Sequence, residues 1–279
     1  MKKIDTPLIS CLCVTKNKPS QLQRAIDCFL YQTYANTELI IVFEDNDPAT
    51  KEMLASVTDK RIKCFEVPAT PKMSLGALRN FSIAKADGDY FCQWDDDDWY
   101  HEARLQVQLD TLLKNHKPAC YMVFWLIYDM LNNRSYFSMG PWAGSLLCQK
   151  SLVTDQLKYP DLGRHEDIVF LKALIRQKHV FPVVMPSLYI YAYHGKNTFG
   201  ESHFNDLFSA SQPLPHHVTE LFRRIFEKQI CYREASRLLL TEDILCPINY
   251  FYFNNEADEV NIAGPEVSAL AASGIEALS

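Results

Sequence analysis

The sequence predicts an α/β fold, built on a mainly parallel, Rossmann-like sheet that is flanked by helices. Short apolar runs of strand length alternate with segments of helical periodicity across residues 8–100. This alternation implies right-handed crossovers, which place helices on both faces of a parallel sheet. Polar and acidic residues follow the strand-like runs, so the sequence also predicts a crevice at the carboxyl edge of the sheet.

The individual elements follow from the same patterns. Strands are expected at residues 8–14, 38–43, 61–67 and 89–94, with helices between them at residues 20–30, 49–57 and 74–86. A hairpin is expected from residues 120–130 and 134–139, then a helix at 166–177, a strand at 188–193 and one or two amphipathic helices at 214–240. The second half of the chain is therefore expected to be mixed.

The length of 279 residues is sufficient to bury a sizeable core. We expect one large domain at residues 1–200, with halves at 1–100 and 101–200, and a C-terminal helical extension at 201–279. Residues 257–279 are rich in small side chains and are expected to form a weakly ordered tail.

Composition excludes several classes of protein. A formal net charge of −6 and a pI near 5.8 offer no basic surface for nucleic acid. No apolar run reaches the ~20 residues that span a bilayer, and the first residues lack a secretory signal pattern. The nine cysteines form no CxxC pair, which is typical of reduced core residues. We therefore expect a cytoplasmic protein, with peripheral contact at the inner face of the membrane as an open alternative.

Four carboxylates, Asp95-Asp96-Asp97-Asp98, come directly after the strand expected at 89–94. Adjacent like charges repel in a partly desolvated site, and a hard divalent cation relieves this repulsion by taking the carboxylate oxygens as ligands. Mn²⁺ and Mg²⁺ both suit such oxygens. The alternative is an acidic turn in which Asp98 caps a helix at 101–115, but a single carboxylate would suffice for a cap. The run therefore predicts a metal site at the edge of the sheet.

Together these patterns resemble glycosyltransferase family two, whose members are nucleotide-diphosphosugar transferases with a GT-A-type fold. The resemblance covers residues 8–199. It rests on Thr15-Lys16-Asn17-Lys18-Pro19 after the first strand, Gln32-Thr33-Tyr34 after the first helix, Glu44-Asp45 after the second strand, Gly76-Ala77-Leu78-Arg79-Asn80, and the acidic run as an Asp-x-Asp signature. Two later segments, Gly163-Arg164-His165-Glu166-Asp167 and Tyr191-Ala192-Tyr193-His194-Gly195-Lys196-Asn197, resemble the acceptor-side and closing elements of the family.

The resemblance implies a role for each candidate residue. Nucleotide-sugar binding falls to Thr15, Asn17, Asp45, Arg79, Asn80, Asp95 and Asp96, with Asp45 preferred to Glu44 as the carboxylate that holds the base. Asp97 is implied as the direct ligand of Mn²⁺ or Mg²⁺, and His194 as a further ligand. Asp167 is implied as the general base, and Glu166 as the residue that orients it or the acceptor. The aromatic face of Trp142 suits a sugar ring of the acceptor, with core packing as an equal alternative.

The implied activity is a metal-dependent, inverting transfer of a sugar from a nucleotide-diphosphate sugar, expected to be a UDP-sugar. The acceptor would be a hydroxyl of a glycan or lipid-linked glycan in polysaccharide or glycoconjugate synthesis. One alternative is a sugar-nucleotide nucleotidyltransferase, although residues 15–20 lack the glycine-rich phosphate loop that such an enzyme needs. Another is a non-catalytic glycan- or nucleotide-binding protein. The basic and apolar residues 221–226 indicate either a packed helix or contact with a membrane surface.

Overall fold

The computed structural model describes residues 6–240 and 244. Its strands form a sheet in the order β3-β2-β1-β4-β7-β6-β9-β5, with β10 paired to β7 and β8 paired to β6. The strands are β1 (Ile9–Val14), β2 (Thr37–Glu44), β3 (Ile62–Val67), β4 (Tyr90–Gln93), β5 (Trp99–Tyr100), β6 (Ala119–Asp129), β7 (Arg134–Gln149), β8 (Val180–Val183), β9 (Tyr189–Tyr193) and β10 (Gln212–Pro213). The tail predicted at residues 257–279 lies outside the described residues.

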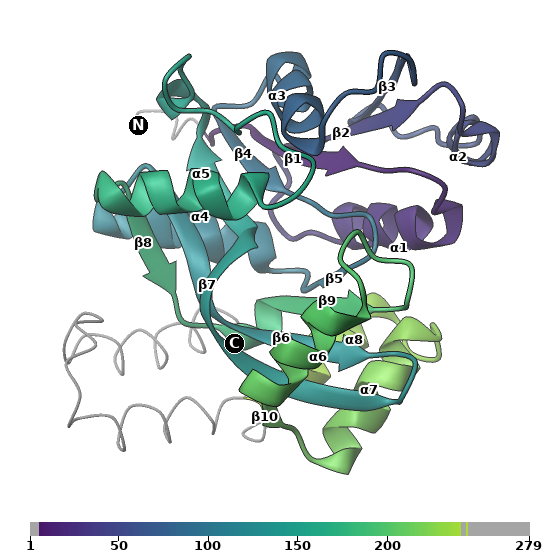
Figure 1. Ribbon diagram of the computed structural model, residues 1–279. Coiled ribbons are helices and arrows are strands. Elements are labelled where there is room, and N and C mark those ends of the chain that lie inside the picture. The colour runs from purple at the N-terminus through teal and green to yellow at the C-terminus, as the bar shows by residue number, and fades with distance from the viewer. Residues whose placement is uncertain (1–5, 241–243, 245–279) are drawn as a thin grey trace.

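Helices lie on both sides of the N-terminal half of the sheet (Figure 1). They are α1 (Pro19–Leu30), α2 (Pro48–Leu54), α3 (Leu75–Lys85), α4 (Arg104–Asn115), α5 (Glu166–Arg176), α6 (Glu201–Ala210), α7 (His216–Phe226) and α8 (Tyr232–Leu238). Two short 3-10 helices, Lys150–Leu152 and Pro186–Leu188, precede α5 and β9. The helices and strands expected from the sequence pattern are therefore present, and most ends differ by a few residues, but β7 continues to Gln149, well beyond the end expected at residue 139.

Alternation along β1 explains how the N-terminal half packs. Cys11 and Cys13 belong to the core that contains Phe29 of α1, whereas Leu12 belongs to the core that contains Leu78 of α3. Successive side chains of a strand point to opposite faces, so a strand that is covered on both faces reads as a continuous apolar run. Strands β3, β2, β1 and β4 are all parallel, which confirms the predicted architecture of this half.

The second half of the sheet is mixed, as predicted. β7 pairs antiparallel with β4 and with β6, and β9 pairs parallel with β6. The sequence pattern did not indicate β5, in which Trp99 and Tyr100 pair antiparallel with Ile190 and Tyr189 of β9. This pairing joins segments that are far apart in the chain, so no local periodicity reports it. It fixes the direction in which the chain leaves the acidic run.

Asp98 does not cap a helix, so that alternative interpretation is wrong. Helix α4 begins at Arg104, after an N-cap at Ala103. The side chain of Asp98 is fully buried, and it accepts hydrogen bonds from the backbone N–H of Ala192, at 3.0 Å, and from the hydroxyl of Tyr189. Asp98 therefore ties the acidic run to β9.

The C-terminal helices pack against the second half of the sheet. Phe222 and Phe226 of α7 are buried, and their rings lie 5.9 and 5.1 Å from the ring of Tyr128. Arg223 forms ion pairs with Glu220 and Glu227 on the same helix. The packed-helix interpretation of residues 221–226 therefore holds, and the membrane contact considered for them is not supported. Within the described ranges, no helix is long and apolar enough to cross a membrane.

His101 connects β5 to α8 through a buried hydrogen bond. Its side chain is 2% exposed, with Nε2 3.1 Å from the carbonyl oxygen of Ser236, and Nδ1 accepts a hydrogen bond from the backbone N–H of Ala103. This pairing requires a neutral ring with the proton on Nε2. Burial lowers the pKa of His101 to about 4.

This pKa shift predicts a loss of stability in weak acid. The unfolded chain, with a histidine pKa near 6.5, binds a proton between pH 6.5 and 4 that the folded protein excludes. The contribution is fully present above pH 6.5 and falls by up to about 3 kcal/mol as the pH decreases to 4. We expect His101→Gln, which keeps an N–H donor toward Ser236, to lose less unfolding free energy between pH 7 and 5 than the parent does in urea denaturation. Equal losses of unfolding free energy in the parent and in His101→Gln would contradict the assignment of a neutral, buried His101 ring.

Candidate active site

A cavity of about 670 Å³ lies at the carboxyl edge of the sheet, between the ends of β1, β2 and β4 and the first turn of α5. This volume is in the range of small-molecule sites. Nine of the predicted site residues line it: Thr15, Asn17, Arg79, Asp95, Asp96, Asp97, Trp142, Glu166 and Asp167. The topology thus brings together segments that are up to 150 residues apart, as the sheet-edge argument requires.

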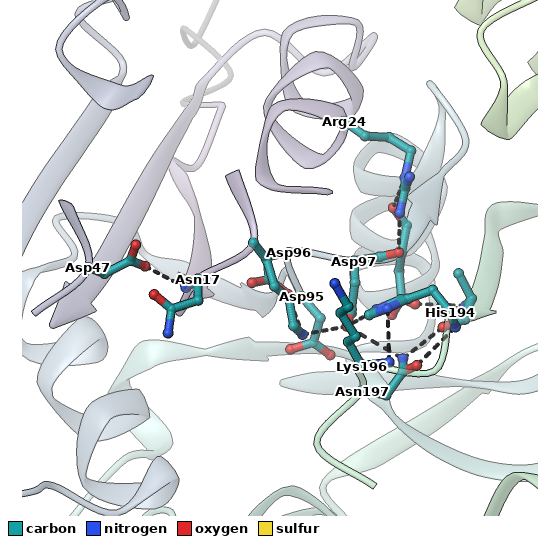
Figure 2. A network of polar contacts seen from close by, with 12 residues as sticks. Asn17, Arg24, Asp47, Asp95, Asp96, Asp97, His194, Lys196 and Asn197 are labelled. Atoms are coloured by element: carbon teal, nitrogen blue, oxygen red, sulfur yellow. Dashed lines mark hydrogen bonds and ion pairs between the residues drawn. The ribbon is translucent and has the colours of Figure 1, made fainter. Parts of the chain in front are cut away.

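The acidic run already holds a cation, the ammonium group of Lys18. Its Nζ lies 2.7 Å from Oδ2 of Asp97 and 3.2 Å from Oδ1 of Asp96. Nε2 of His194 approaches the same Oδ2 of Asp97 at 3.1 Å. Figure 2 shows Asp97 of the acidic run facing His194, which follows the end of β9.

The two buried carboxylates of this cluster differ in their protonation. Burial, and then the negative charge of Asp97, raise the pKa of Asp96 to about 7. Burial acts on Asp97 in the same direction, but the hydrogen bond with His194 and the charge of Lys18 outweigh it and hold its pKa below the usual value. Asp97 is therefore the carboxylate that stays charged, as a metal ligand must.

The donor set at Asp97 fits Mn²⁺ or Mg²⁺. A carboxylate oxygen and an imidazole nitrogen lie side by side, and the cluster attracts a positive charge, as the position of Lys18 demonstrates. Over the described part of the chain, no group of three or more His, Cys, Asp or Glu side chains is arranged to hold a metal by itself. The remaining coordination positions would therefore fall to water and to phosphate oxygens of a ligand, which is how proteins usually bind Mg²⁺.

Arg79 joins the acidic run to α5. The side chain is buried, with Nε 2.8 Å from Oε1 of Glu166 and Nη2 3.1 Å from Oδ1 of Asp95. These carboxylates raise its pKa further despite burial, which alone would lower it. A fork-shaped guanidinium that is fixed on two sides holds both carboxylates in place.

Asn80 corrects an expectation drawn from the same segment. It does not line the cavity. Its amide nitrogen donates to the carbonyl oxygen of Tyr159 at 2.8 Å, and its amide oxygen accepts from the backbone N–H of Tyr159 at 3.2 Å. Because both of its polar atoms are engaged there, Asn80 positions the loop before α5.

Gly76 allows α3 and the loop before α5 to come into contact. A Cβ atom at this position would lie 1.8 Å from the carbonyl oxygen of Pro160, and the Gly76 N–H donates to the carbonyl oxygen of Leu162 at 2.9 Å. Ser74 caps the N-terminus of α3 by accepting from the N–H of Ala77. This close approach brings the acidic first turn of α5 to the cavity.

Glu166 and Asp167 occupy that first turn, but only one of them is available to a substrate. Glu166 is 2% exposed and bound to Arg79, and burial raises its pKa. Asp167 is half-buried and lines the cavity, and its Oδ1 accepts a hydrogen bond from the N–H of Ile168 at 2.7 Å. The geometry thus separates an orienting carboxylate from one that can accept a proton.

At the other end of the cavity, Glu44 takes the position expected for Asp45. Glu44 is buried, lines the cavity and pairs with Lys16. Asp45 is exposed and accepts a hydrogen bond from the N–H of Ala69 at 3.0 Å, outside the cavity lining. The structure therefore places Glu44, and not Asp45, at the cavity. Asp47 caps the N-terminus of α2, because its side chain accepts a hydrogen bond from the N–H of Thr50.

Trp142 packs against other aromatic rings, and its stacking against a sugar ring stays a prediction. It lines the cavity, and its ring also packs 4.3 Å from Trp125 and 4.6 Å from Tyr191. His194 contacts Asp97 but is not among the residues that line the cavity. Sequence reasoning missed Lys18 as a partner of the acidic run; its place in the turn after β1, at the same edge of the sheet, was the available signal.

Comparison with known proteins now adds to this geometry. The family model of glycosyl transferase family 2 matches residues 10–172, more than half of the 279 residues. The chain belongs to this family. The matched segment contains the acidic run and the first turn of α5 but ends before His194.

Curated relatives match part of the chain. An uncharacterized glycosyltransferase of Haemophilus influenzae is 33% identical over 115 residues, which cover 40% of this chain and 45% of that protein. The Escherichia coli UDP-Glc:alpha-D-GlcNAc-diphosphoundecaprenol beta-1,3-glucosyltransferase WfgD is 29% identical over 134 residues, which cover 47% of this chain and 50% of that protein. The matched part spans about half the length of these relatives.

Solved structures of low sequence identity share the fold, which is of the GT-A type. The S. aureus TarS 1–349 complex with UDP-GlcNAc has a TM-score of 0.53 at 14% identity and covers 94% of this chain and 78% of that chain. The mannosyltransferase PcManGT from Pyrobaculum calidifontis, in complex with GDP-Man and Mn²⁺, has a TM-score of 0.53 at 13% identity and covers 98% and 81%.

Proposed function

We propose that this protein is a metal-dependent, inverting glycosyltransferase that uses a UDP-sugar as donor and a hydroxyl of a glycan or lipid-linked glycan as acceptor. One observation carries the proposal. The cavity is lined by the carboxylate cluster that holds the ammonium group of Lys18 and also by a separate, half-buried carboxylate, that of Asp167. Membership of glycosyltransferase family 2 supports it. The UDP-sugars named for WfgD and TarS support the choice of donor, and the Mn²⁺ named for PcManGT supports the choice of metal.

The residues of the cavity divide the chemistry between them. Asp97 and His194 would hold Mn²⁺ or Mg²⁺, which neutralises negative charge on the departing diphosphate. Asp167 accepts the proton of the acceptor hydroxyl as the bond from that oxygen to the anomeric carbon forms. The bond from the anomeric carbon to the diphosphate oxygen breaks with its electron pair on the diphosphate. A single displacement of this kind inverts the anomeric configuration.

Binding tests the first half of the proposal. Thermal shift of the full chain should be compared among UDP, GDP, UDP-glucose, UDP-GlcNAc and GDP-mannose, each with and without Mn²⁺. A ligand present at a hundred times its Kd adds about 2.7 kcal/mol to the unfolding free energy. We expect UDP and UDP-sugars to raise Tm only with Mn²⁺, and EDTA to cancel the rise. Shifts in Tm that are equal with and without Mn²⁺ would contradict metal dependence. A separate assay tests the alternative activity: exchange of labelled pyrophosphate into a nucleoside triphosphate would favour a nucleotidyltransferase.

Lys18 predicts how metal affinity responds to a substitution. Its ammonium competes with any divalent cation for Asp97, so we expect Lys18→Met to tighten Mn²⁺ binding about tenfold, or ~1.4 kcal/mol. Without metal the same variant leaves buried carboxylates less compensated, and its unfolding free energy should fall by about 1–3 kcal/mol. Calorimetric titration with Mn²⁺ alone measures the first effect.

The matched control is Lys16→Met, which removes an ammonium that pairs with Glu44 and not with the acidic run. We expect Mn²⁺ affinity to stay at the parent value in this control. A Lys18→Met variant that binds Mn²⁺ no more tightly than the control would refute competition at Asp97.

The expected cytoplasmic location of the protein stays a prediction.

A further inference from the structure

The outer face of α5 carries an exposed stripe beside the entrance of the cavity. Val169, Lys172 and Arg176 are exposed and recur at the spacing of one helical face, whereas Phe170 and Leu174 point into the core. Helix α5 lies at the surface of the molecule toward the viewer in Figure 1. This stripe, together with Leu162 just before the helix, is here called the α5 outer face.

The charged side chains of the α5 outer face, those of Lys172 and Arg176, are both cationic, and the carboxylate beside Leu162, that of Asp161, accepts a hydrogen bond from Ser74. Across the described residues, Lys172 and Arg176 take part in none of the ion pairs of the structure. The two acids of the helix point elsewhere: Glu166 is buried against Arg79, and Asp167 lines the cavity. A cationic surface therefore stands out on a chain whose formal net charge is −6.

Apolar side chains lie within the same face. Leu162 is 42% exposed and Val169 is 40% exposed, which places both among the few large apolar side chains that are exposed in the described part of the chain. The residues between them, Gly163–Ile168, line the cavity. Exposed apolar groups that alternate with unpaired cations, at the rim of an active-site cavity, match the chemistry of a bilayer surface, where apolar groups enter the interface and cations meet anionic headgroups.

We propose that the α5 outer face docks on an anionic lipid bilayer and presents the cavity, with Asp167 at its edge, to an acceptor that is carried by a membrane lipid. The part that concerns the acceptor rests on the proposed function; the docking itself does not. Leu162 and Val169 enter the interfacial layer, and Lys172 and Arg176 contact lipid phosphates. This arrangement delivers the reacting hydroxyl to Asp167 without removing the lipid from the membrane.

Docking is tested by flotation of the full chain with two kinds of vesicle, phosphatidylcholine alone and phosphatidylcholine with a third phosphatidylglycerol. We expect binding to the anionic vesicles only, released by high salt because the attraction is electrostatic. The double variant Lys172→Glu/Arg176→Glu should bind at least tenfold more weakly, and Leu162→Asp should also weaken binding. The matched control is Lys60→Glu/Arg233→Glu, which reverses two exposed cations on other elements and should bind as the parent does.

The outcomes separate docking from the proposed function. Thermal shift with UDP and Mn²⁺ should be the same in the parent and in both double variants. Sugar transfer to an acceptor embedded in anionic vesicles should fall at least tenfold in Lys172→Glu/Arg176→Glu, whereas transfer to a soluble form of that acceptor should be unchanged. Equal vesicle binding by the parent and this variant, or failure of the parent to bind anionic vesicles, would overturn the docking. A transfer defect with both acceptor forms would point to a protein partner or to damage of the active site instead.

Discussion

Asp167→Asn is expected to lower the turnover number about 10²–10⁴-fold, the usual contribution of a positioned general base. The amide oxygen of Asn can still accept the hydrogen bond from the N–H of Ile168, so the first turn of α5 should keep its shape. Binding of UDP with Mn²⁺, measured by thermal shift, should therefore stay at the parent value. The effect falls on turnover because only proton acceptance is lost.

The control for this prediction is Asp161→Asn. Asp161 is an exposed carboxylate on the loop before α5, where it accepts a hydrogen bond from Ser74, and its replacement should leave turnover within a few fold. Turnover by Asp167→Asn at the parent rate would show that another group accepts the proton. Loss of UDP binding in the same variant would show that Asp167 belongs to the donor site.

Local patterns in the sequence were sufficient to predict most of the strands and helices and the place of the acidic run, although not β5, β8 or α6. The reason is that strands buried on two faces are continuously apolar and end in polar residues at the carboxyl edge. The position of Asp97 at the cavity follows from that rule alone. The contacts of Asp97 with Lys18 and His194 do not follow from it, because these two residues lie about 80 and 97 residues away from Asp97 in the sequence.

Other parts of the site depend on contacts that no local pattern reports. The side chain of Asp98 is buried and accepts hydrogen bonds from Tyr189 and Ala192 of β9. The sequence could not distinguish this role from a helix cap, because both roles need a polar side chain after a strand. The choice between Glu44 and Asp45 turned on where β2 ends, and strand ends are the least certain feature of a sequence pattern. Arg79 was expected to face phosphates, but two carboxylates hold it on two sides.

Asp97→Asn is the second substitution with a large expected effect, because Asp97 is where three segments converge on a cation. Lys18, His194 and Asn197 all approach its Oδ2, at 2.7, 3.1 and 3.5 Å. Replacing the charged oxygen removes the ligand and the charge that attracts the metal. We expect Mn²⁺ affinity, measured by calorimetric titration, to fall by about tenfold to a hundredfold, which is the usual effect of damage to a metal site. We expect kcat/KM to fall about a thousandfold, as for loss of one electrostatic group at developing charge.

Asp96→Asn is the matched control, and it makes the prediction sharp because the two carboxylates are adjacent and share Lys18. The pKa of Asp96 is raised to about 7, so near neutral pH this group already carries a proton in much of the population. A neutral amide therefore changes the charge at position 96 far less than at position 97, where the pKa is held low. Mn²⁺ affinity should follow the order parent, Asp96→Asn, Asp97→Asn, with the larger step at Asp97. The reverse order would mean that Asp96 holds the cation and that the pair with His194 only positions the strand.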